Sequence, residues 1–120
     1  MILVDTSVWV EHLRRRSAGL AGLLDQGLVA CHPFVIGELA LGALKDRTGL
    51  LGLLAKLPAA RIVRHEDALA MVQRRALFER GIGWVDVHLV ASALVDRWPL
   101  WTLDRRLGAV ARDLKAAWEG

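Results

Sequence analysis

The chain has 120 residues and a mass of 13.2 kDa, with 54% apolar residues, sixteen basic and thirteen acidic residues. This length fits one domain with a substantial core, and no apolar run approaches the ~18–20 residues of a membrane-spanning helix. The segment 1–4 has no basic residues ahead of its apolar run, unlike a signal peptide. Cys31 is the single cysteine, so it forms no internal disulfide or cysteine zinc site, and we expect it to be buried. We therefore expect one cytoplasmic domain spanning residues 1–120, without membrane contact.

The apolar pattern predicts short strands that alternate with helices. In chain order we expect a strand at 1–4, a helix from 6, a short helix near 20–24, a strand at 28–31, helices at 33–42 and 48–57, a short strand at 61–63, helices at 66–80 and 84–97, a strand at 100–102 and an amphipathic helix from 103. In the helix at 66–80, the pattern places Leu69, Val72, Ala76 and Phe78 on the inner side. The helix at 84–97 is apolar on almost all sides, which predicts burial. The alternation indicates an α/β fold: a three-layer α/β/α sandwich with a four- to five-stranded parallel sheet.

Four of the acidic residues lie in unusually apolar surroundings. Asp5 ends the first predicted strand and Asp104 follows the last one, while Glu38 lies inside an apolar segment and Asp86 begins the most apolar helix. A carboxylate in such surroundings costs several kcal/mol unless it is paired or protonated. Because parallel sheets bind their ligands at the carboxyl ends of strands, we expect these acids to converge there.

Carboxylate oxygens are the ligands that hard divalent cations prefer, so the four acids predict a Mg²⁺ or Mn²⁺ site of the kind used in phosphoryl chemistry. Each acid also has a simpler explanation. Asp5 and Asp104 precede helices and suit N-caps, Asp86 would complement its helix dipole, and Glu38 could reach solvent or an arginine. Four separate explanations account poorly for the whole pattern.

At these positions the chain resembles PIN domains, most closely the VapC-type toxins of bacterial toxin–antitoxin pairs. The resemblance rests on Asp5-Thr6-Ser7 after an apolar strand, Gly37-Glu38-Leu39, Trp84-Val85-Asp86-Val87 and Thr102-Leu103-Asp104 in this order, and it covers the whole chain. It implies that Asp5, Asp86 and Asp104 hold Mg²⁺ or Mn²⁺, that Glu38 binds through water, and that Ser7 braces the site. It also implies an endoribonuclease that cuts structured RNA such as tRNA, a homodimer, and a cognate antitoxin that inhibits it.

The basic residues cluster at 14–16, 74–75 and 105–106. If the four acids face a cation, sixteen basic residues are balanced by only nine acids, which favours a polyanionic partner such as RNA. Arginines of the first or third cluster are candidates to hold phosphates that flank the cleaved bond, although each cluster could equally be a solvated helix face.

Other signals are weaker. The histidines His12, His32, His65 and His88 lack the paired spacing of a helical zinc site. Trp9, Trp101 and Trp118 fit core positions, and Trp84 could either pack in the core or stack on a base.

Three other functions remain in competition. An aspartyl-phosphate phosphatase would need a second aspartate two positions after Asp5, where Ser7 stands. A DNA-directed nuclease of this kind would be larger. A PIN-like module that binds RNA or a partner without cutting is the main alternative, but a pocket of four acids repels phosphate and would not serve binding alone.

Overall fold

The computed structural model describes residues 1–120 as a small parallel sheet with seven helices. The strands are β1 (Ile2–Val4), β2 (Val29–Ala30) and β3 (Leu100–Trp101), in the order β2-β1-β3. In the central strand β1, Leu3 is paired in register with Ala30 on one side and with Leu100 on the other. All three residues of β1 are buried, as their continuous apolar run predicts.

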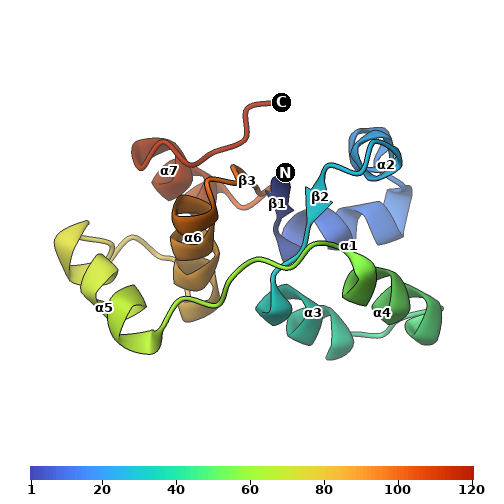
Figure 1. The fold of residues 1–120 in the computed structure, drawn as a ribbon, viewed down its shortest axis with the longest axis horizontal. Coiled ribbons are helices and arrows are strands. Elements are labelled where there is room, and N and C mark those ends of the chain that lie inside the picture. Colours follow the sequence, from blue (N-terminus) through green and yellow to red (C-terminus); the bar gives the residue numbers. More distant parts are fainter.

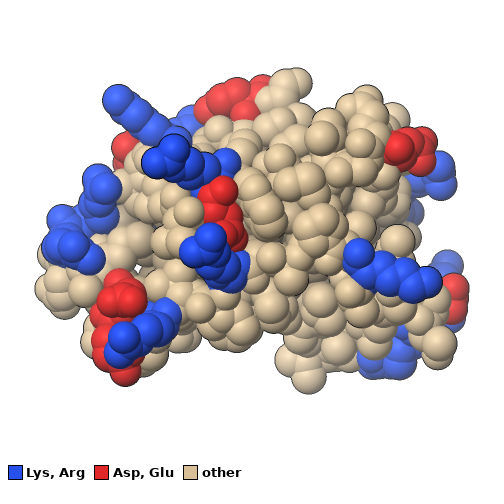
Figure 2. All heavy atoms as spheres, viewed as in Figure 1, with Lys and Arg blue, Asp and Glu red and all other residues tan.

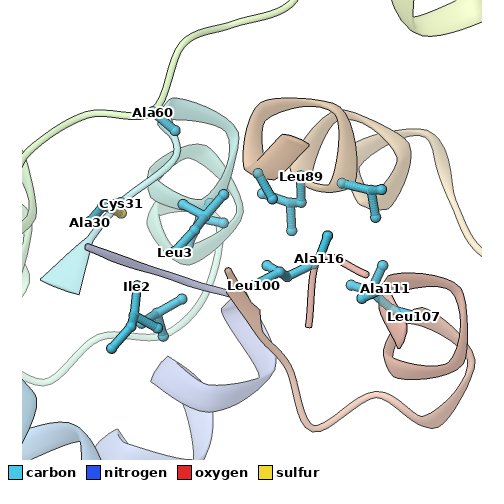
Figure 3. Packing of buried hydrophobic residues seen from close by; sticks show 14 of the residues in the cluster. Ile2, Leu3, Ala30, Cys31, Ala60, Leu89, Leu100, Leu107, Ala111 and Ala116 are labelled. Carbon is cyan, nitrogen blue, oxygen red and sulfur yellow. The ribbon is translucent and has the colours of Figure 1, made fainter. Parts of the chain in front are cut away.

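The helices cover both faces of this sheet (Figure 1). They are α1 (Thr6–Arg15), α2 (Ala18–Asp25), α3 (Pro33–Ala40), α4 (Arg47–Lys56), α5 (His65–Arg74), α6 (Trp84–Asp96) and α7 (Arg105–Asp113). Figure 3 shows Leu3 directed toward α3 and toward Leu89 of α6, while Ile2 points to the opposite side, toward α1. Adjacent residues of a strand face opposite sides of a sheet, so both layers of helices pack on β1. The predicted α/β/α sandwich is confirmed.

The sheet has three strands where four or five were expected. At each edge a single bridge takes the place of a further strand: Cys31 pairs with Ala59, and Leu100 pairs with Ala117, both in parallel. Two hydrogen bonds hold the second bridge, from Leu100 N to Ala116 O at 2.7 Å and from Trp118 N to Leu100 O at 2.9 Å. The edges are therefore paired over too short a length to count as strands.

The strand predicted at 61–63 does not form. The Asp96 carboxylate accepts a hydrogen bond from the Arg61 backbone N–H at 3.0 Å and pairs with the Arg61 Nε at 3.1 Å. The Arg61 carbonyl accepts a hydrogen bond from Ser92 Oγ, which also contacts the buried His32 ring. The backbone N–H and carbonyl of Arg61 are thus both bonded to α6, and residues 61–64 run as a connector fastened to that helix at Arg61.

The helix predicted at 66–80 is shorter than expected and faces differently. It ends at Arg74, because Ala76 adopts a left-handed conformation (φ 52°) and Leu77 N bonds back to Val72 O at 2.9 Å. This pairing is a typical helix C-terminal arrangement. The placement of the inner side was right for Val72, which packs against the core, and wrong for Leu69, Ala76 and Phe78, which are exposed. The buried residues of this segment are Ala68, Met71 and Leu77.

The core consists of 26 buried apolar residues. The helix α6 contributes a continuous run of buried residues, 87–93, as its all-round apolar pattern predicts. Cys31 is buried as expected, and burial raises the pKa of its thiol to about 12. Trp9 is buried as well, while Trp101 and Trp118 are half-buried and pack on each other with ring centroids 4.7 Å apart. None of the helices has the length and apolar character needed to cross a membrane.

Candidate active site

Asp5 lies where β1 ends and α1 begins, and it is the one buried acid of the four. Its Oδ2 accepts hydrogen bonds from Ser7 Oγ at 2.7 Å and from Thr102 Oγ1 at 2.7 Å. The same two hydroxyls accept hydrogen bonds from the next turn of chain, from Leu103 N to Ser7 Oγ at 2.9 Å and from Asp104 N to Thr102 Oγ1 at 3.0 Å. Ser7 and Thr102 therefore join the end of β1 to the β3–α7 turn and fix Asp5 relative to Asp104.

Glu38 and Asp104 come from two different helices, α3 and the start of α7. Glu38 is exposed on α3, and its Oε1 accepts a hydrogen bond from Thr6 Oγ1 at 2.6 Å. Asp104 precedes α7 and accepts a hydrogen bond from Leu107 N at 2.9 Å through Oδ1. The first residue of α1 thus positions an acid that is 32 positions away in the chain.

Asp86 lies in the first turn of α6, and its Oδ2 accepts a hydrogen bond from Gly83 N at 3.0 Å. Burial raises the pKa of its carboxyl above the ordinary value, and the hydrogen bond from the Gly83 backbone opposes that rise. The negative charges of three other carboxylates raise this pKa further, those of Asp5, Asp104 and Glu38. The structure therefore brings together all four acids that the sequence singles out.

None of these four carboxylates forms a salt bridge. The ion pairs of the structure join Arg15 with Glu11, Arg61 with Asp96, Arg64 with Glu66 and Arg80 with Asp113, and none of them involves the four acids. Crowded carboxylates without a counter-charge repel one another. A bound cation relieves that repulsion.

The donor set fits a hard divalent cation in its chemistry, although the side chains are not yet arranged around one. No three acidic, histidine or cysteine side chains lie in an arrangement that could hold a metal ion as they stand. In each of the four acids one oxygen is hydrogen-bonded within the protein, and the structure gives the other oxygen no hydrogen bond. These second oxygens accept no hydrogen bond within the protein, and oxygen ligands of this kind suit Mg²⁺ or Mn²⁺.

The simpler explanations of three acids also hold. Asp5 and Asp104 are the N-caps of α1 and α7, and Asp86 accepts a backbone hydrogen bond in the first turn of α6. Capping uses one oxygen of each and does not require the helices to begin side by side. It leaves the crowding of charge around Asp86 unexplained.

Sequence reasoning missed two hydroxyl residues of the site. Thr102 donates to Asp5 and Thr6 donates to Glu38, and the sequence pattern assigns a role to neither. The available signal was position: each threonine lies within two residues of a predicted site acid, at the end of a strand or the start of a helix. Ser7, which the resemblance names as a brace, does contact Asp5.

The histidines lie outside the group of acids and contact aromatic rings. The rings of His32, Phe34, His88, Trp84 and His65 form a row with successive centroids 4.9, 5.0, 4.9 and 5.3 Å apart. Burial lowers the pKa of both His32, to about 4, and His88. Trp84 packs against the rings of His88 and His65 but is 40% exposed, so it lies at the edge of the core and not inside it.

Two cavities adjoin the acids. The α1–α3–α4 groove, of about 970 Å³, is lined half by apolar residues from these helices and includes Thr6 and Glu38. The α7 pocket, of about 490 Å³, is lined by Gly81, Asp104, Arg105 and Arg106 and has no apolar lining. The site is thus flanked by one half-apolar and one polar depression.

Comparison with known proteins gives two findings. The model of the PIN domain family matches residues 2–113. Two curated relatives named "Ribonuclease VapC32", from the CDC 1551 / Oshkosh and ATCC 25618 / H37Rv strains of Mycobacterium tuberculosis, are each 51% identical over 114 residues, which is 94% of this chain and 92% of the relative.

Proposed function

Since the chain belongs to the PIN-domain family and is similar to VapC ribonucleases along most of its length, we propose that it is a metal-dependent endoribonuclease toxin that cleaves structured cellular RNA, with tRNA as a candidate, and is inhibited by a cognate antitoxin. One observation carries the proposal: the charges of Asp5, Glu38 and Asp104 all act on the Asp86 carboxyl, and none of the four acids forms a salt bridge. A module that only bound RNA would be weakened by such a pocket, because it repels phosphate.

In this proposal Asp5, Asp86 and Asp104 hold Mg²⁺ or Mn²⁺, and Glu38 binds through a water molecule. Such a cation, when bound, polarises a phosphate and lowers the pKa of water. Ser7 and Thr102 keep the Asp5 carboxylate in place by donating hydrogen bonds to it. Hydrolysis adds the oxygen of water to phosphorus and breaks the bond to the 3′ oxygen. The products are a 5′-phosphate and a 3′-hydroxyl.

The antitoxin is assigned to the α1–α3–α4 groove. This groove is the larger cavity beside the acids, half of its lining is apolar, and Glu38 forms part of it. An amphipathic protein segment that covers exposed apolar side chains here, such as Leu53, would lie against Glu38 and close one side of the site. Its binding would therefore exclude RNA.

A homodimer is also part of the proposal. Ile62 on the connector, Leu69 on α5 and Val95 on α6 are each about half exposed, and α5 packs on α6. Exposed apolar side chains on neighbouring elements are typical of association surfaces. A second copy of the chain would cover them.

The test is cleavage of total cellular RNA by the purified protein with Mg²⁺, with Mn²⁺ and with EDTA. Asp86→Asn is the test variant because asparagine keeps the shape and can still accept from Gly83 N, but it lacks the charge. Asp25→Asn is the matched control, because Asp25 is an exposed aspartate at the end of α2, remote from the four acids in the chain.

We expect discrete cuts that require metal, persist in Asp25→Asn and vanish in Asp86→Asn, with 5′-phosphate ends. A 2′,3′-cyclic phosphate on the products would contradict the water-attack mechanism. Folded protein free of antitoxin that binds RNA but leaves it intact under all conditions would support the non-catalytic module instead.

A further inference from the structure

The α7 pocket places two unpaired guanidinium groups beside a site acid. Arg105 and Arg106 follow Asp104 directly, and all three line the pocket with Gly81. The structure gives neither arginine an ion pair, and neither side chain donates a hydrogen bond, whereas Arg80 next to the pocket is paired with Asp113 at 2.8 Å. Guanidinium groups that lie free in a polar depression favour an anion as their partner.

Gly81 makes room for the Arg106 side chain. Its φ is +78°, which favours glycine, and a Cβ built at this position would lie 2.7 Å from Arg106 Nη1 and 2.8 Å from Arg106 Cδ. The loop that carries Gly81 is fastened to the far end of α7 by the Arg80–Asp113 pair. The pocket is therefore an exposed depression lined by two segments of the chain that the Arg80–Asp113 pair links.

Resting on the proposed ribonuclease activity for the identity of the ligand, we propose that the α7 pocket is a phosphate subsite, in which Arg105 and Arg106 hold an RNA backbone phosphate next to the one that is cleaved. Asp104 is shared between this pocket and the group of acids, so the two phosphates would lie on its two sides. Arg14 is the competing candidate, but it lies in the α1–α3–α4 groove, whose lining is half apolar.

Two kinds of variant test the pocket: one removes the charge of Arg106, and the other displaces its side chain. Arg106→Gln removes the charge from an exposed side chain and leaves the fold intact, and Arg74→Gln on α5 is the matched control, because Arg74 is exposed and unpaired. Gly81→Ala displaces Arg106 without removing its charge, and Gly22→Ala is its control, because a Cβ at Gly22 meets nothing within 4 Å. Since Gly81→Ala also strains the backbone, thermal unfolding of each variant is measured alongside.

The experiment uses an RNA oligonucleotide that contains the cleaved bond, with one neutral methylphosphonate placed in turn at each neighbouring phosphate. In the wild-type protein, kcat/KM should fall about tenfold or more when the phosphate held by the pocket is neutral, since hydrogen bonds between charged groups are strong. In Arg106→Gln the parent oligonucleotide should show the same loss, and the methylphosphonate should cause no further one. The slope of log affinity against log salt should become shallower by about 0.7, because the variant neutralises one phosphate fewer.

Equal behaviour of Arg106→Gln and Arg74→Gln would overturn the subsite, as would a methylphosphonate loss that persists in Arg106→Gln at every position. Binding of the same oligonucleotides is followed by fluorescence anisotropy, so failure of the activity itself is distinguishable. If the wild type cuts RNA and Arg106 has no effect, the subsite fails alone. If nothing is cut but Arg106→Gln still weakens binding at one phosphate, the subsite stands and the cleavage proposal fails.

Discussion

At the residue scale, Asp5 depends on its two hydroxyl partners. Ser7 Oγ and Thr102 Oγ1 both donate to Asp5 Oδ2 at 2.7 Å, and each also accepts from the turn that carries Asp104. Thr102→Val keeps the shape of the side chain and removes the donor. Residues that orient metal ligands typically contribute about 10–100-fold to metal affinity or activity.

We therefore expect Thr102→Val to raise the Mn²⁺ concentration that half-saturates RNA cleavage by roughly tenfold or more, and Thr102→Ser to restore it. The restoration separates loss of the hydroxyl from loss of packing. A metal titration of Thr102→Val that coincides with that of the wild type would show that this hydroxyl does not position Asp5.

His32 makes the stability of the fold depend on pH. Its ring is fully buried, Nδ1 accepts from Phe34 N at 2.9 Å and Nε2 contacts Ser92 Oγ at 3.1 Å. The pKa of His32 is lowered from 6.5 to about 4, chiefly by burial and also by the charge of His88, against the opposing charge of Asp96. As the pH falls, the His32 imidazole therefore becomes protonated near pH 6.5 in the unfolded chain but only near pH 4 in the folded chain.

This contribution to stability is complete above pH 6.5 and is lost as the pH falls toward 4, and it amounts to roughly 1–3 kcal/mol. Urea unfolding across this range should show a smaller loss in His32→Gln than in the wild type and in His65→Gln, an exposed histidine, because the lowered pKa of His88 contributes in the same direction. Parallel pH profiles for the wild type and His32→Gln would contradict the assignment.

Among the elements, the C-terminal end of α5 lowers the stability of the fold, because a non-glycine residue there adopts a left-handed backbone conformation. Ala76 has a φ of 52°, a conformation that costs an L-residue about 1 kcal/mol and glycine very little. Ala76→Gly should therefore raise the free energy of unfolding by roughly 0.5–1 kcal/mol, whereas Ala70→Gly inside the same helix should lower it by about as much. Chemical denaturation of both variants tests the pair, and a loss of stability in Ala76→Gly would show that the helix does not end there.

The elements also show which parts of the fold the sequence predicts. The buried helix α6 and the central strand β1 follow from uninterrupted apolar patterns, and both form where expected. The early end of α5 did not follow, because nothing in local propensity marks Ala76 as left-handed. The predicted strand at 61–63 does not form because the backbone N–H of Arg61 donates to Asp96, which lies 35 positions further along the chain.

A variant of Asp96 tests whether α6 holds the connector between α4 and α5 in place. The Asp96 side chain is 6% exposed and engages both the backbone N–H and the side chain of Arg61. Asp96→Ala should lower the free energy of unfolding by about 1–3 kcal/mol, because it leaves a donor without its partner. Asp67→Ala, an exposed acid in the first turn of α5, should cost less. Equal effects would show that α6 does not hold the connector.

At the scale of the whole molecule, four separate segments supply the site, and the sequence predicted the acids better than their setting. Asp5, Glu38, Asp86 and Asp104 could be named because each interrupts an apolar stretch. Their hydroxyl partners Thr6 and Thr102 could not, since those contacts join residues 32 and 97 positions apart. The arrangement of the second carboxylate oxygens is likewise a property of the folded chain.

Charge is distributed unevenly over the molecule. On the face drawn in Figure 2, basic side chains gather over α5 and α7, while the area over β1 and β2 is largely uncharged. An RNA bound at the site would meet α7 through Arg105 and Arg106, as the phosphate subsite requires.

The proposed homodimer is tested by light scattering of the Leu69→Glu variant. If α5 lies in the contact between the two copies, the variant should have the mass of one chain. A mass equal to that of the wild-type dimer would show that α5 lies outside the contact.

The proposed catalysis depends on the four carboxylates forming a divalent-cation site. The direct measurement is Mn²⁺ binding to the purified protein, followed by electron paramagnetic resonance without any RNA. We predict that the wild type and Asp25→Asn bind Mn²⁺ and that Mg²⁺ displaces it, while Asp86→Asn and Asp104→Asn lose the binding. Folded Asp86→Asn and Asp104→Asn proteins that bind Mn²⁺ as well as the wild type does would contradict the account.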